Sequence, residues 1–115
     1  MANTFKVVTK AGVTSADVIY TVAGSTTTVV LGLILGNTTS SSINATVTLG
    51  TDTANRAGAN NETNQDVELI TTTPIPGNSS LELLSGNKVV METTDTLSVT
   101  GTGATDVVLS IMEIT

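Results

Sequence analysis

Residues 43–49 read Ile-Asn-Ala-Thr-Val-Thr-Leu, and apolar and polar side chains alternate through the whole stretch. Successive side chains of an extended strand point to opposite faces, so Ile43, Ala45, Val47 and Leu49 share one face. Asn and Thr occupy the other face, as expected where one side of a sheet meets water. This stretch therefore predicts a β-strand with one face in a hydrophobic core.

Similar runs recur every 10 to 15 residues and are separated by clusters of Gly, Asn, Ser and Thr, a spacing typical of a β-sandwich or small barrel. No stretch has the sustained 3.6-residue periodicity of an amphipathic helix. The sequence predicts an all-β fold, a jelly-roll-like antiparallel β-sandwich of about eight short strands in a single domain, 1–115. The runs that we interpret as strands are 5–9, 17–23, 27–35, 43–49, 66–72, 79–84, 88–92, 96–100 and 106–114.

Two of these strands are apolar on both faces. They are 27–35 and 106–114, and in the second Met112 and Ile114 lie on the face opposite Leu109. A strand covered on both sides lies inside a stack of layers or faces a neighbouring subunit. Met112 and Ile114 are therefore candidate interface residues of a homo-oligomer, a trimer or another cyclic assembly. Packing in the inner core is the alternative.

Local patterns also make two smaller predictions. In 17–23, alternation places Val18, Tyr20 and Val22 on one face. The tripeptide Ser-Gly-Asn at 85–87 is typical of a tight hairpin turn, which would pair the strands on either side of it.

Two segments hold few core-forming residues: an N-terminal arm at about 1–16 and a long polar loop at 50–65. Ordering a loop costs on the order of 1 kcal/mol per residue in backbone entropy, which polar residues do not offset among themselves. We therefore expect both segments to contact other proteins. The candidate contact residues in them are Phe5, Lys6, Lys10 and Arg56, of which the last three are three of the four cations of the chain.

The composition removes most of the chemistry of active sites. Thr occupies 24 of 115 positions, whereas His, Cys and Trp are absent. Without imidazole or thiolate, the usual general base, activated nucleophile and transition-metal ligands are missing. Ser85 and Lys88 form a pair without an orienting group, at a predicted turn. The sequence predicts no enzyme, no catalytic residue and no cofactor.

Charge and hydropathy limit the partners. The formal net charge of −6 repels nucleic-acid phosphates and anionic membrane surfaces, so we expect neither as a partner. The longest apolar run, 29–35, is far shorter than the ~20 residues of a membrane-spanning helix.

An acidic cluster is the remaining candidate for a ligand site. Its members are two residues apart and share one face of an extended segment, where carboxylates could hold Ca²⁺; they are Glu62, Asn64, Asp66 and Glu68. The calcium-loop pattern is missing, and a solvated acidic face explains the same spacing, so no metal is predicted.

The second half of the chain resembles small virion structural proteins of tailed bacteriophages. The residues that carry the resemblance there are Pro74-Ile75-Pro76-Gly77, Ser80-Leu81-Glu82-Leu83-Leu84, Lys88-Val89-Val90, Glu92, Asp95, Leu97-Ser98-Val99-Thr100 and 108–115. In the first half they are Ile19-Tyr20-Thr21-Val22 and 26–33. The Pro-Ala-Gly that often follows the Tyr-Thr-Val in this family is replaced by Ala23-Gly24-Ser25.

The resemblance implies a non-enzymatic protein located in the virion, with other virion proteins as partners. The leading prediction is a capsid decoration (cement) protein that binds the major capsid protein and copies of itself. A tail-, neck- or fibre-associated structural protein is the close alternative. A host-surface adhesin is a third, although the scarcity of aromatic residues disfavours it.

Overall fold

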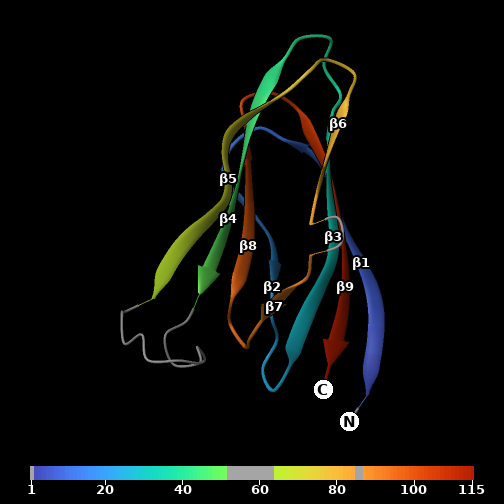
Figure 1. The fold of residues 1–115 in the computed structure, drawn as a ribbon, viewed down its shortest axis with the longest axis vertical. Helices are drawn as coiled ribbons and strands as arrows, with labels where there is room; N and C mark the ends of the chain where they lie inside the picture. Colours follow the sequence, from blue (N-terminus) through green and yellow to red (C-terminus); the bar gives the residue numbers. More distant parts are fainter. Residues whose placement is uncertain (1, 52–63, 85–86) are drawn as a thin grey trace.

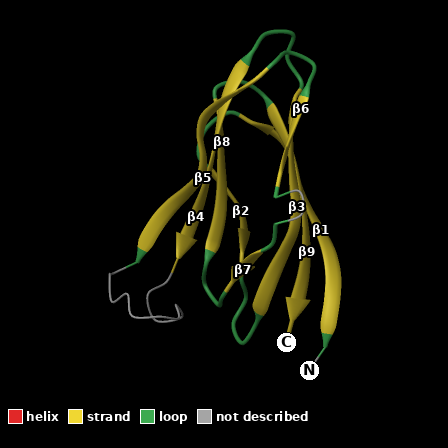
Figure 2. Ribbon diagram, in the orientation of Figure 1, coloured by secondary structure: helices red, strands yellow, loops and turns green. Residues whose placement is uncertain are grey.

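The computed structural model describes residues 2–51, 64–84 and 87–115, which form two antiparallel β-sheets packed face to face (Figure 1). Within these ranges there are nine strands and no helix (Figure 2). The strands are β1 (Asn3–Val13), β2 (Asp17–Thr21), β3 (Thr27–Asn37), β4 (Ile43–Thr51), β5 (Gln65–Ile75), β6 (Ser80–Leu83), β7 (Val89–Met91), β8 (Thr96–Gly101) and β9 (Thr105–Ile114).

The strand order is that of a rolled-up hairpin, which is the jelly-roll arrangement. Sheet A has the order β1-β9-β3-β6, with β7 also paired to β3, and sheet B has the order β2-β8-β4-β5. The pairs β1–β9, β2–β8, β3 with β6 and β7, and β4–β5 join the first half of the chain to the second in nested fashion. The predicted all-β sandwich is therefore confirmed.

The core lies between the inner faces of the two sheets. The alternation in 43–49 is confirmed, because Ile43, Ala45 and Val47 are buried and the residues between them face outward. Both sheets contribute large aliphatic side chains to this core, and those of one inner face pack against those of the other. The fully buried residues include Val30, Leu33, Leu35, Leu109 and Ile111 from sheet A, and Val47, Ile75, Leu97 and Val99 from sheet B.

The N-terminal segment is not a free arm. The sequence places only 5–9 in a strand, whereas β1 pairs regularly with β9 from Asn3 opposite Ile114 to Lys10 opposite Val107. These main-chain hydrogen bonds order the segment within the domain, so the argument that it needs an outside partner to be ordered does not hold. Lys6 and Lys10 interrupt the apolar and polar alternation from which strand length is predicted. Such lysines are common on an edge strand, where they discourage further pairing.

Two local predictions were wrong. β6 and β7 do not pair with each other, because the long strand β3 provides an edge for both: β7 pairs with Thr28–Val30 and β6 with Leu33–Gly36. A β-bulge between Val18 and Tyr20 separates their side chains, so that Val18 is 54% exposed while Tyr20 packs against the core. The extra residue of a bulge shifts the alternation, and nothing in the local pattern shows it.

Asn37, at the end of β3, joins two connections of the jelly roll. Its side chain is buried, and its amide nitrogen donates to the carbonyl oxygens of Ser41 (2.8 Å), Ile75 (2.9 Å) and Pro76 (3.1 Å). Its amide oxygen accepts hydrogen bonds from the main-chain nitrogen and the hydroxyl of Thr39. The two protons of the amide nitrogen serve three carbonyl oxygens, one proton being shared, so a single side chain ties the β3–β4 turn to the end of β5.

Candidate interaction surface

The outer face of sheet A, directed away from the core, is apolar. Of the seven exposed large hydrophobic side chains among the described residues, five lie here, and Phe5 is the most exposed of them at 72%. Half-buried aliphatic side chains fill the space between them. We call this surface the apolar face; it consists of Phe5, Val7, Val29, Ile34, Val90, Val108, Met112 and Ile114.

The strand register assembles this face from segments that are distant in sequence. Phe5 on β1 lies opposite Met112 on β9, Met112 lies opposite Val29 on β3, and Val29 lies opposite Val90 on β7. Residues opposite each other in an antiparallel pair are on the same side of the sheet, so these four form one row across four strands. The next row along the strands contains Val7, Ser110 and Gly32.

The outer face of sheet B is mostly polar by contrast, with Val18 opposite Ser98 as an exposed apolar exception. Thr46 lies opposite Thr100, and Thr48 lies opposite both Ser98 and Glu68. Short hydroxylated side chains suit a sheet surface that remains in water. The two outer faces of the sandwich therefore have opposite chemistry, and the apolar one is of the kind that marks an interaction site.

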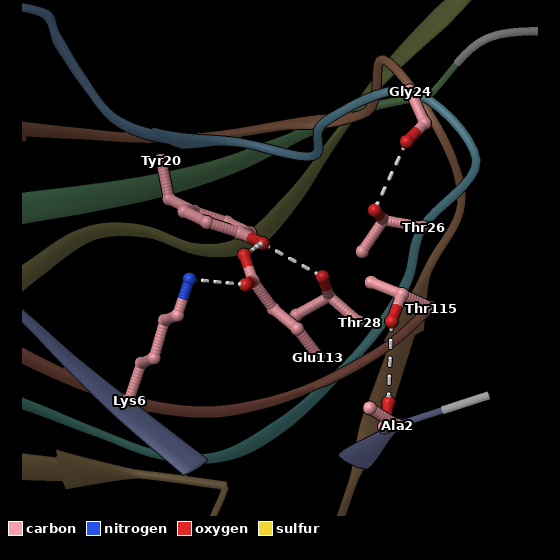
Figure 3. Close-up of polar contacts among 8 residues, drawn as sticks. All are labelled: Ala2, Lys6, Tyr20, Gly24, Thr26, Thr28, Glu113 and Thr115. Carbon is pink, nitrogen blue, oxygen red and sulfur yellow. Dashed lines mark hydrogen bonds and ion pairs between the residues drawn. The ribbon is translucent and has the colours of Figure 1, made fainter. Parts of the chain in front are cut away.

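A polar network at the open end of the sandwich links the two sheets (Figure 3). Lys6 Nζ lies 2.7 Å from a carboxylate oxygen of Glu113, which points toward the interior from β9. From β2 in the other sheet, the Tyr20 hydroxyl donates to Glu113 Oε2 at 2.6 Å and lies 2.7 Å from Thr28 Oγ1. Because the phenol has one proton, which goes to the carboxylate, Thr28 is the donor to Tyr20.

This network shifts two pKa values in opposite directions. Hydrogen bonds from Lys6 and Tyr20 hold the pKa of Glu113 below its ordinary value. Burial and the hydrogen bond to Glu113 raise the pKa of Tyr20 to about 12. Each shift favours the pairing of a neutral phenol with a charged carboxylate, and this pair links β2 of sheet B to β9 of sheet A.

Tyr20→Phe is expected to lower the free energy of unfolding by about 1–2 kcal/mol at pH 7, because a hydrogen bond to a carboxylate is lost. Since the folded chain lowers the pKa of Glu113, the stabilisation from this group is present above pH ~4.5 and is lost as the pH falls. Tyr20→Phe should lose less unfolding free energy on acidification than the unmodified chain, because one of the two hydrogen bonds that lower the pKa of Glu113 is gone. Urea unfolding between pH 7 and pH 3 measures both effects, and an unchanged acid dependence would contradict this role.

The structure brings together some of the candidate contact residues predicted from the sequence. Phe5, Met112 and Ile114 share the apolar face, and none of them is in the core; that they contact another subunit stays a prediction. Lys6 and Lys10 have acidic partners within the chain, Lys10 Nζ lying 3.6 Å from Asp17 Oδ2. Arg56 and most of the loop at 50–65 lie outside the described residues.

The acidic residues do not converge in the part of the chain that the structure describes, where no group of three or more Asp and Glu side chains is placed to hold a metal ion. Asp66 and Glu68 face outward on β5, and Glu68 accepts a hydrogen bond from the Thr71 hydroxyl. Glu62 lies outside the described residues. Asp66 also lines a polar hollow of about 300 Å³ together with Gly50, Asn64 and Thr96, and it is the one acid among the described residues that line it.

Sequence reasoning missed Val7, Ile34, Val90 and Val108 as surface residues of this face. Alternation in β1 separates Phe5 and Val7 from Lys6 and Val8, which could have assigned the first two to one side. Their place in one face with β3 and β7, across β9, follows from long-range pairing, for which the sequence contains no local signal.

Comparisons with protein-family models, with curated protein sequences and with solved structures found no match. The described residues include no helix long and apolar enough to cross a membrane.

Proposed function

We propose that this protein is a non-enzymatic structural component of a tailed-bacteriophage virion, a capsid decoration protein that binds the shell and strengthens it. The observation that supports this proposal best is the contrast between the apolar outer face of sheet A and the polar outer face of sheet B. A sandwich with one apolar outer face is suited to being built into a larger assembly. The resemblance of the sequence to small virion proteins supports a virion as that assembly.

The fold agrees with this role by analogy. Jelly rolls occur in viral capsid domains, and also in lectins and other proteins, so the architecture favours no single function by itself. The stabilising mechanism would be mass action, because a subunit that binds only the assembled shell shifts the equilibrium toward assembly. No covalent chemistry is required of the protein.

The location is tested by counting copies in purified particles of the parent phage with quantitative mass spectrometry. A shell repeats its subunits by symmetry, so a decoration protein should be present in hundreds of copies per particle. A few to dozens of copies would instead assign it to the tail or neck. Absence from the purified particle would rule out a virion protein altogether.

The mechanism is tested with particles that lack this protein. Adding the purified chain should raise the temperature at which the particles release their genome, with saturation at the stoichiometry found by mass spectrometry. Binding without any gain in thermal resistance would rule out a strengthening role.

A further inference from the structure

The centre of the apolar face carries no charge, although the whole chain has a formal net charge of −6. The central rows contain Phe5, Met112, Val29 and Val90, then Val7, Ser110 and Gly32. Charged residues lie around these rows: Glu82 is opposite Ile34 at the β6 side, and Lys88 and Glu92 flank β7. An uncharged centre with charge at its rim is the usual anatomy of a protein interface.

A hollow of about 160 Å³ lies at the β3–β6 side of sheet A. It is located where the partner of β3 changes from β7 to β6, beside the outward-facing Ile34. A Cβ atom built at Gly32 would have no atom within 4 Å, so Gly32 leaves this space open. The other residues around the hollow are Leu31, Leu33, Glu82, Leu83 and Leu84.

The side chain that matches this hollow is on the same face. Phe5 is the only Phe of the chain, and it is 72% exposed on β1, at the opposite side of sheet A from β6. An apolar cavity of about 150 Å³ is large enough to bind benzene, which has the size of the Phe ring. One face thus carries both a projecting aromatic ring and an apolar hollow of its size.

We propose that the apolar face binds the apolar face of a second copy of this chain, with Phe5 of each copy packing at the hollow of the other. Two identical faces that pack against each other are related by a two-fold axis lying between them. An axis perpendicular to the line from Phe5 to the hollow exchanges these two positions, which brings each Phe5 to the hollow of the other copy. Of the cyclic assemblies predicted from the sequence, this geometry selects the dimer.

The size of the face is sufficient for a stable pair. β1, β3 and β9 are 10 to 11 residues long, and β6 and β7 together add seven residues beside β3. With strands about 4.8 Å apart and about 3.4 Å per residue, this face covers roughly 600 Å² per copy. Two such faces bury roughly 1,200 Å², the lower end of the range for specific interfaces. The row of Ser110 and Gly32 has small side chains beside that of Phe5, which allows the sheets to approach closely.

The test is the mass of the purified full-length protein by light scattering and sedimentation equilibrium. We expect a dimer of twice the 11.7 kDa of one chain, with a dissociation constant in the micromolar range. Phe5→Glu should raise this constant at least about 30-fold, which corresponds to about 2 kcal/mol and to an interface hot spot. The matched control is Val18→Glu, an exposed apolar residue on a strand of sheet B, which should leave the constant within about two-fold.

A second variant tests the hollow itself. Gly32→Val adds a side chain in open space on a strand, so it should preserve or raise the melting temperature of the fold. The same side chain occupies the space proposed for Phe5 and should weaken association at least about tenfold, a cost of about 1.4 kcal/mol. A melting temperature that is kept or raised together with a weaker dimer affinity would show that the interface is lost while the fold is intact.

Two results would overturn the proposal. The first is a single-chain mass at the highest soluble concentration. The second is a dimer that neither Phe5→Glu nor Gly32→Val weakens, because another surface would then form it.

If the chain is monomeric and Phe5→Glu abolishes binding to phage particles, the apolar face binds another virion protein and the dimer is excluded. A dimer that does not bind particles would support this inference and contradict the proposed virion function, so the two fail separately.

Discussion

Asn37→Asp is expected to lower the free energy of unfolding by about 4 kcal/mol or more, a large part of the stability of a small domain. The substitution replaces the amide nitrogen that donates to the carbonyls of Ser41, Ile75 and Pro76 with a carboxylate oxygen. The buried carboxylate then faces three carbonyl oxygens that it cannot satisfy. A buried charge without a partner is among the few single changes with so large a cost.

Equilibrium unfolding in urea measures this loss, and Asn44→Asp is the matched control. Asn44 is exposed on the outer face of β4, so the same chemical change there should cost less than about 0.5 kcal/mol. Thr39→Ala removes one hydroxyl proton, which is shared between the Asn37 oxygen and the Ser41 carbonyl, and should cost about 1 kcal/mol. A cost for Asn37→Asp no larger than that for Thr39→Ala would show that the amide does not hold the two connections together.

The importance of Asn37 could not be predicted from the sequence. It lies in the cluster Gly-Asn-Thr-Thr-Ser-Ser-Ser at 36–42, which has the composition of an ordinary turn. Two of its partners, Ile75 and Pro76, are 38 and 39 residues away, and only the folded chain brings them to the amide. Gly77 is next to them, where an added Cβ would lie 2.3 Å from the carbonyl oxygen of Ser40. Close packing between two connections has no local sequence pattern.

Period-two alternation made the fold class predictable. In 43–49 each residue type matches its side of the strand, because burial on one face selects apolar side chains there. The strand 106–114 is apolar on both faces, and its inner side ends with the charged Glu113. Alternation failed for Val18, where a bulge shifts it. The turn composition of 85–87 predicted the wrong partners for β6 and β7, which pair with β3 instead of each other. Bulges and pairing partners are set by tertiary packing rather than by local propensity.

The candidate surface was predictable only in fragments. Phe5, Met112 and Ile114 were interface candidates as separate residues, and the alternation of 106–114 placed the last two away from Leu109. The row that joins Phe5 to Met112, Val29 and Val90 depends on the register of three strand pairs. The charged candidates carried less information, because Lys6 and Lys10 pair with Glu113 and Asp17 of the same chain.

The two sides of β9 should differ sharply when their side chains are truncated. Leu109→Ala is expected to cost about 3 kcal/mol in free energy of unfolding, because Leu109 is fully buried between the sheets and its loss leaves a cavity. Val108→Ala should cost less than about 1 kcal/mol, since Val108 is 38% exposed on the apolar face. Leu109 and Val108 are both aliphatic and differ in burial, so the comparison shows on which side of β9 the core lies.

Both substitutions are best measured by urea unfolding in the Phe5→Glu background. Association through the apolar face would stabilise the folded chain in a concentration-dependent way and would increase the apparent cost of Val108→Ala. In that background association no longer adds to the free energy of unfolding. An unchanged slope of this free energy against urea concentration would confirm that the variants unfold by the same transition. Equal costs at the two positions would mean that β9 is buried on both sides within a single chain. The apolar face would then belong to the core, and there would be no surface for a partner to cover.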